Sequence, residues 1–138
     1  MTTAIMNLNE GMATNGATSQ MLSFAVDGYD AIKTVYNAVN NAETMEGHDG
    51  EEFTLLGIIQ NPDVVVDPVT NVERDCISTV LITDSGNYFS RSAGIAKSAR
   101  NLMNAFAAAG GWPSDPVTVS VVSRKLDNRR TWKSLELK

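Results

Sequence analysis

The chain has 138 residues and a formal net charge of −5, and its length fits one domain with a core of its own. A single cysteine, Cys76, excludes an internal disulfide, and a single histidine, His48, makes most metal sites and catalytic triads hard to build. No run reaches the roughly 18 apolar residues of a membrane span, so we expect no membrane partner. The first residues lack the basic start and apolar stretch of a signal peptide, so we expect a cytoplasmic protein.

Charge is divided unevenly along the chain. Residues 1–73 carry one basic side chain, Lys33, against eleven acidic ones, whereas residues 74–138 carry ten basic against five acidic ones. The basic half also contains three aromatic residues on strand-like segments: Tyr88, Phe89 and Trp132. Cations interleaved with flat rings suit a single-stranded nucleic acid, because phosphates attract positive charge and unpaired bases stack. The plainer alternative is a charge-segregated domain without a ligand.

Residues 1–20 are rich in Gly, Asn, Thr and Ala without periodicity, so we expect a flexible arm ahead of one domain, residues 21–138. A first helix is predicted next, because Asp27 and Asp30 can cap it and apolar residues follow at helical spacing. These residues are Ile32, Val35, Tyr36 and Val39. Glu43–Glu52 is predicted to be an acidic loop, since it combines five acids with two glycines.

Three strands are predicted after this loop. Phe53–Gln60 is a continuous apolar run, which Asn61-Pro62 is expected to interrupt. Cys76–Thr83 alternates, with Thr79 on one face and its two neighbours on the other. A turn rich in Gly and Asn then leads into the return strand, Tyr88–Arg91.

A second helix is predicted after Ser92, which can cap it, with apolar positions that share one face: Ile95, Ala99, Leu102, Met103 and Phe106. Gly110-Gly111 ends this helix. Val117–Ser123 and Thr131–Leu137 are the last two strands, and the turn Arg124–Arg130 between them is strongly basic.

This order of elements is the connectivity of the oligonucleotide/oligosaccharide-binding (OB) fold, a partly open Greek-key barrel. The sequence therefore predicts a mainly β protein: a five-stranded OB-like barrel with a helix between strands three and four and an extra N-terminal helix. In that fold strands two and three face the ligand, flanked here by the connection Asn61–Asp75 and the basic turn. A ferredoxin-like sheet is the alternative, but it needs a helix between its first two strands.

Strand parity selects the candidate stacking residues. Leu135 and Leu137 are expected to face the core, which places Trp132 on the polar face as a stacking platform. The alternative is that Trp132 covers the barrel end or packs beneath the N-terminal helix. Tyr88 and Phe89 point to opposite faces. Tyr88 is favoured for the ligand because its hydroxyl tolerates water, and Phe89 for the core, unless a bulge exchanges them.

Motifs for catalysis are not found. The glycines form no phosphate-binding loop, and His48 lies in a glycine-flanked acidic loop typical of a solvated surface. Cys76 has the parity of a packing residue. We therefore expect no enzyme activity, no cofactor and no metal site, with a metal-independent hydrolase as a distant alternative.

The segment from Ile77 to Leu102 combines several features in a fixed order: the strand Ile77-Ser78-Thr79-Val80, Asp84 in the hairpin, Tyr88, Ser92, and then Ile95-Ala96 and Leu102 on the helix. The strand Val117–Val122 follows, and the chain closes on Trp132, Ser134-Leu135 and Leu137. With this order and spacing, roughly the C-terminal half resembles the single-stranded DNA-binding proteins of small tailed phages that replicate linear genomes by protein priming. Departures are the Asp-Ser-Gly turn, the bulky Phe89 and the long arm.

The resemblance implies non-specific, cooperative coating of displaced strands during phage DNA replication, in the cytoplasm of the bacterial host. It assigns base contacts to Tyr88 and Trp132 and a groove-lining position to Thr79. Seven basic residues are expected to neutralise phosphates: Arg74, Arg91, Arg124, Lys125, Arg129, Arg130 and Lys133.

Expected partners are single-stranded DNA, replication proteins, and further copies of the chain that associate through apolar residues of the arm. These residues are Ile5, Met6, Leu8 and Met12. The alternative function belongs to another class: an OB-like protein-interaction or anti-defence module whose basic strip binds an acidic protein or a nucleotide ligand.

Overall fold

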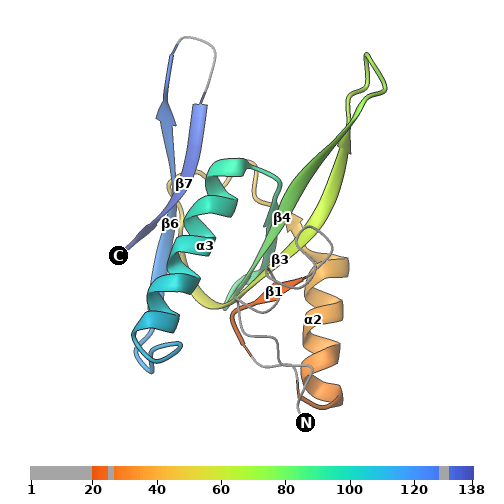
Figure 1. Cartoon of the computed structure of the whole chain (residues 1–138). Helices are drawn as coiled ribbons and strands as arrows, with labels where there is room; N and C mark the ends of the chain where they lie inside the picture. The colour runs from red at the N-terminus through yellow and green to blue at the C-terminus, as the bar shows by residue number, and fades with distance from the viewer. Residues whose placement is uncertain (1–19, 25–26, 128–130) are drawn as a thin grey trace.

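The computed structural model describes residues 20–24, 27–127 and 131–138 (Figure 1). The fold is mainly β: one curled sheet forms a half-barrel, and two helices lie against it. In chain order the elements are β1 (Met21–Leu22), α2 (Tyr29–Asn41), β2 (Glu43–Thr44), β3 (Glu52–Val66), β4 (Glu73–Thr83), β5 (Gly86–Ser90), α3 (Ala93–Ala108), β6 (Val117–Lys125) and β7 (Thr131–Leu137). Neither helix of the described part is long and apolar enough to cross a membrane.

The strands are ordered β2-β5-β4-β3-β6-β7, and β1 pairs with β3 beside this path. All pairs are antiparallel except β2 with β5. Among the described strands β5 is not paired with β7, so the half-barrel is open on that side. α3 begins at this opening: a Cβ added to Gly94 would lie 1.9 Å from the carbonyl oxygen of Lys133. Only glycine therefore lets the helix approach the free edge of β7 this closely.

The predicted long strands and both helices correspond to observed elements, and the two-residue strands β1 and β2 were not predicted. The predicted interruption at Asn61-Pro62 is wrong, because β3 continues to Val66 with Pro62 opposite Ile77. Beyond Gln60, β4 is the only described neighbour of β3. A proline is tolerated at such an edge, since its missing N–H leaves no sheet hydrogen bond unmade on the open side.

Two hairpins project from the half-barrel on either side of α3 (Figure 1). The β3–β4 arm consists of residues 61–78, where β3 pairs with β4 from Asn61 opposite Ser78 to Val66 opposite Glu73. The β6–β7 arm consists, in the described part of the chain, of residues 122–127 and 131–134, where Lys125 lies opposite Thr131. The predicted connection Asn61–Asp75 therefore consists mostly of paired strands.

The two faces of the sheet bury separate clusters. The inner face packs against α3, with Ile58 of β3 and Leu81 of β4 in contact with a cluster that includes Ile95. The outer face packs against α2 and β1, where Ile59 and Val80 are buried. Adjacent residues of one strand thus belong to different faces, as strand geometry requires and as the alternation over Cys76–Thr83 predicted.

Candidate nucleic-acid interface

Thr79 lies on the inner face and has no exposed surface (0%). Its hydroxyl accepts a hydrogen bond from Gln60 Nε2 at 3.2 Å, and the same amide donates to the carbonyl of Ala96 on α3 at 2.8 Å. Thr79 therefore helps to tie the sheet to α3, and the expectation that it lines a ligand groove is wrong. Its strand neighbours Ser78 and Val80 lie on the outer face instead.

Tyr88 and Phe89 point to opposite faces, as predicted, and β5 pairs with β4 without a bulge. The ring of Tyr88 lies 4.9 Å from that of His48 and 5.0 Å from that of Phe53, centre to centre, at the rim of the inner cluster. Phe89 is half-buried on the outer face, where the guanidinium carbon of Arg91 lies 5.3 Å from the centre of its ring. Phe89, and not Tyr88, thus borders the open clefts.

The sheet register places side chains in rows on the outer face. Asn61 of β3 lies opposite Ser78 of β4, and Val80 of β4 lies opposite Phe89 of β5. Thr79 pairs with Ser90, so Arg91, the next residue along the chain, lies level with Ser78 on β4. A polar row therefore crosses β3, β4 and β5, whose neighbouring strands are about 4.8 Å apart, and it is formed by Asn61, Ser78 and Arg91. This row lies beside the apolar pair Val80 and Phe89.

Arg91, which follows β5, is held by Asp63 of β3 across the intervening strand β4. Its Nε donates to Asp63 Oδ2 at 2.7 Å, and its side chain remains 49% exposed. This hydrogen bond lowers the pKa of the Asp63 carboxyl below its ordinary value of 3.8, with a further contribution from the Val64 N–H and against the opposing effect of partial burial. Guanidinium has five N–H donors, so Arg91 keeps donors for a ligand, although Asp63 engages one of them and partly offsets its charge.

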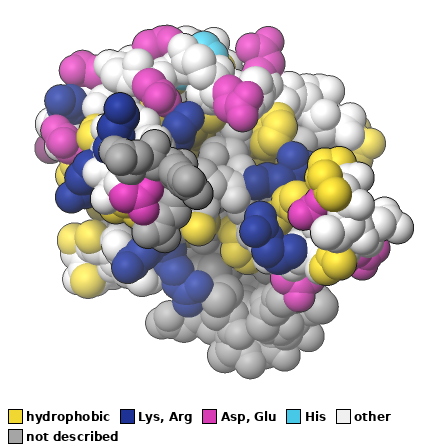
Figure 2. Space-filling view, turned by 90° about the horizontal axis from the view of Figure 1, so that it is seen from above, with side chains coloured by type: hydrophobic (Ala, Val, Ile, Leu, Met, Phe, Trp, Pro, Cys, Tyr) yellow, Lys and Arg dark blue, Asp and Glu magenta, His cyan; other side chains and the backbone are white. Residues whose placement is uncertain are grey.

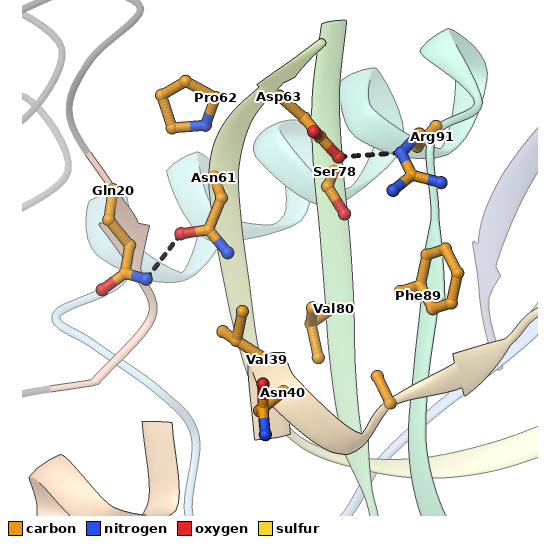
Figure 3. A pocket seen from close by; sticks show the side chains of 11 residues that line it. Gln20, Val39, Asn40, Asn61, Pro62, Asp63, Ser78, Val80, Phe89 and Arg91 are labelled. Carbon is orange, nitrogen blue, oxygen red and sulfur yellow. Dashed lines mark hydrogen bonds and ion pairs between the residues drawn. The ribbon is translucent and has the colours of Figure 1, made fainter. Parts of the chain in front are cut away.

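Two clefts meet at Phe89 and Arg91. The first, which we call the amide cleft, has a volume of about 580 Å³ and lies between α2 and the outer face of β3, β4 and β5 (Figure 3). The second, the edge cleft, has a volume of about 510 Å³ and lies at the open side of the half-barrel between β5 and β7. Phe89 and Arg91 line both, so the two clefts adjoin at these residues.

Lys133 lies at the β7 side of the edge cleft, and its Nζ is 3.3 Å from Asp49 Oδ1. The neighbouring Trp132 is half-buried, and its ring comes within 2.9 Å of a Cβ placed on Gly94, so it packs over the first turn of α3. The expected core position is confirmed for Leu135, which contacts the inner cluster. The same expectation is wrong for Leu137, which is 52% exposed because β7 is an edge strand of the sheet.

Three further predicted cations of the described residues lie on the two arms. Arg74 is exposed on β4 opposite Val65, and Arg124 and Lys125 are exposed at the end of β6. Seen from above, Lys and Arg side chains lie on both sides of a hollow, while Asp and Glu side chains gather along one edge (Figure 2). Arg129 and Arg130 lie outside the described residues, as does the predicted arm apart from Gln20.

The structure therefore brings Arg91 and Lys133 to two adjoining clefts. It adds Phe89, which the sequence favoured for the core, and four polar residues that the sequence did not name as site residues: Gln20, Asn40, Asn61 and Ser78. The parity of Ser78 was visible in the alternating strand. Asn61 was hidden because the following proline indicated a break.

Within the described ranges, no three His, Cys, Asp or Glu residues gather in a way that could hold a metal ion. Cys76 lies opposite Asp63, and burial raises the pKa of its thiol, with the negative charge of Asp63 acting in the same direction. The thiolate is therefore scarce at neutral pH.

Comparison with protein-family models, curated proteins and solved structures found no match for this chain. The resemblance to phage proteins remains a prediction from the sequence.

Proposed function

We propose that the protein binds single-stranded DNA, without catalysis, by passing the strand over the edge cleft and the amide cleft. We also propose that the half-barrel is an open form of the OB fold. Its five long strands follow the order β5-β4-β3-β6-β7, which corresponds to strands three, two, one, four and five of that fold. α3 lies between the third and fourth of these strands in sequence.

One observation carries the binding proposal: the guanidinium of Arg91 lies over the ring of Phe89, and both residues line both clefts. An aromatic face offers a stacking surface to a base of any identity, and a guanidinium pairs with phosphate. Their combination where two clefts adjoin is typical of surfaces that bind an unpaired strand.

Charge around the clefts extends this surface. Lys133 supplies a second cation across the edge cleft, and the arms carry Arg74 on one side and Arg124 and Lys125 on the other. Acidic residues border the same region, with Glu46 in the edge cleft and Asp49 on Lys133. A duplex presents twice the phosphate density of a single strand, so this acidic border disfavours it.

Within this proposal the protein coats displaced strands during phage DNA replication, the role that the resemblance implies. Replication proteins and further copies of the chain are then its partners.

Fluorescence anisotropy of labelled oligo-dT, matched duplex and matched RNA tests the proposal. We expect tighter binding to the single strands and a log–log salt slope of a few units, since each single-strand phosphate contact contributes about −0.7. Arg91→Ala should weaken binding, whereas Lys33→Ala, which removes an exposed cation of α2 outside both clefts, should not. Equal affinity for duplex or a flat salt response contradicts the proposal and favours a module that binds an acidic protein or a nucleotide.

A further inference from the structure

The helix α2 exposes large apolar side chains along one face. Tyr29 is 75% exposed, Ile32 is 53% exposed and Tyr36 is 65% exposed. The two tyrosines are seven residues apart, so they lie on the same side of the helix, two turns or about 10.5 Å from each other. A contiguous exposed apolar face of this kind marks an interaction site.

A groove follows this face of α2 and adjoins the amide cleft. We call it the helix groove; its volume is about 350 Å³, and it is lined by Gln20, Ile32, Val35, Tyr36, Val39 and Asn40. Three of these residues, Gln20, Val39 and Asn40, also line the amide cleft. In Figure 3 Val39 and Asn40 lie at the lower end of the amide cleft, while Asp63 and Arg91 lie at its upper end. A strand that enters beside Arg91 can therefore leave along α2.

The charged groups of the amide cleft offset one another. Asp63 pairs with Arg91 at 2.7 Å, so the pair carries no net formal charge, and no other described residue of the lining is charged. The described lining of the helix groove contains no charged residue. Asp30 and Lys33 of α2, one of each sign, lie outside that lining. Beyond Arg91 the route therefore offers apolar and aromatic surfaces in place of phosphate contacts.

Exposed tyrosine rings are suited to unpaired bases. Every base has a flat face that stacks on an aromatic ring whatever its identity, and the phenol hydroxyl can remain in water. Tyr36 borders the helix groove, and Tyr29 stands two turns further from the amide cleft. The face thus presents two stacking surfaces in succession beyond the ring of Phe89.

We infer that the bound strand continues from the amide cleft along α2, where Tyr36 stacks one base and Tyr29 a second. The inference rests on the proposed function and lengthens its binding path by a segment that contacts bases of any identity and no phosphates. The strand is the occupant because the helix groove adjoins the amide cleft and shares three residues with it. A protein partner packed on the same apolar face is the outcome that the test must separate from it.

The test measures by anisotropy the affinity of labelled oligo-dT of about 16 nucleotides, the upper end of the site sizes of one OB domain. We expect Tyr36→Ala to weaken binding about fivefold or more, as the loss of one stacked base requires, and Tyr36→Phe to bind as wild type does because it keeps the ring. Neither variant should change the salt slope, since no phosphate contact is lost. Asn37→Ala is the matched control, because Asn37 is the exposed neighbour of Tyr36 and lines none of the three clefts.

Unchanged affinity of Tyr36→Ala, in a variant with wild-type circular dichroism, overturns the inference while the proposed function stands, and it leaves the face of α2 to a protein partner. A smaller salt slope in Tyr36→Ala also overturns it, because the ring would then act through phosphate contacts. If Tyr36→Ala does not fold, Tyr29→Ala replaces it with the same expectation. Weaker binding by Tyr36→Ala together with unchanged binding by Arg91→Ala keeps the site on α2 and rejects the proposed path over the clefts. Absence of any binding to oligo-dT by the wild type rejects both.

Discussion

The two faces of the sheet differ in how completely they are covered. On the inner face α3 seals a cluster in which Ile58, Leu81 and Ile95 have no exposed surface. On the outer face α2 covers less: Tyr36 on this helix remains 65% exposed, and the amide cleft lies beside it. The same strands supply both faces, so residues adjacent in sequence have separate tasks. Stability depends mainly on the inner face, and binding, in our account, on the outer one.

Adjacent residues of β4 give the largest test of this difference. Leu81→Ala removes a fully buried inner side chain and should lower the free energy of unfolding by about 2–5 kcal/mol. Ile82→Ala removes a half-buried outer side chain and should cost clearly less, because its site can refill with water or neighbours. Urea denaturation followed by circular dichroism measures both. Equal costs would show that the outer face contributes to stability as much as the inner one.

Tyr88 and Phe89 repeat the comparison on β5. Phe89→Ala should weaken binding to oligo-dT by about 1–3 kcal/mol, the cost of losing one stacked base, and leave the fold intact. Tyr88→Ala should instead destabilise the protein, because the ring packs on His48 and Phe53, with unchanged affinity per folded molecule. Anisotropy and thermal unfolding of both variants provide the two readouts. If Tyr88→Ala weakens binding and Phe89→Ala destabilises the protein instead, Tyr88 is the stacking residue, as the sequence suggested.

Asp63 limits how freely Arg91 meets a ligand, so Asp63→Asn should strengthen binding. Exposed ion pairs contribute about 0.2–1 kcal/mol, which sets the gain at up to about fivefold at pH 7. The pKa of Asp63 is lowered in the folded protein, so its contribution to stability is complete above the ordinary value of 3.8 and is lost as the pH falls through the lowered pKa. The stability difference between wild type and Asp63→Asn should therefore vanish in acid. Persistence of that difference at pH 2 would show that the ion pair is not its cause.

The arms should produce the smallest effects. Arg74→Ala and Arg124→Ala each remove one exposed cation far from the core. Each should reduce the magnitude of the slope of log affinity against log salt concentration by about 0.7 if that residue contacts a phosphate. The affinity at high salt should change little. Lys33→Ala serves again as the control. An unchanged slope in both variants would confine the interface to the clefts.

Periodicity was sufficient to predict the long strands and both helices, because alternation and helical spacing are local properties. The position of Pro62 was not a local property: among the described residues β4 is the only neighbour of β3 at that point, and only the assembled sheet shows this. Strand parity correctly placed Thr79 and Val80 on opposite faces of the sheet, and likewise Tyr88 and Phe89. Parity did not identify which face of the sheet remains accessible to a ligand, because that depends on where α2 and α3 pack. Thr79 was therefore placed on the wrong side.

Methyl-group NMR spectra during titration with oligo-dT test most directly the claim that the outer face binds the strand. The methyl groups of Val80 and Val39 line the amide cleft, while those of Ile58 and Leu81 lie in the inner cluster. Our account predicts that the signals of Val80 and Val39 shift in a saturable manner and that those of Ile58 and Leu81 stay nearly still. Saturable binding with no shift at Val80 or Val39 would contradict it.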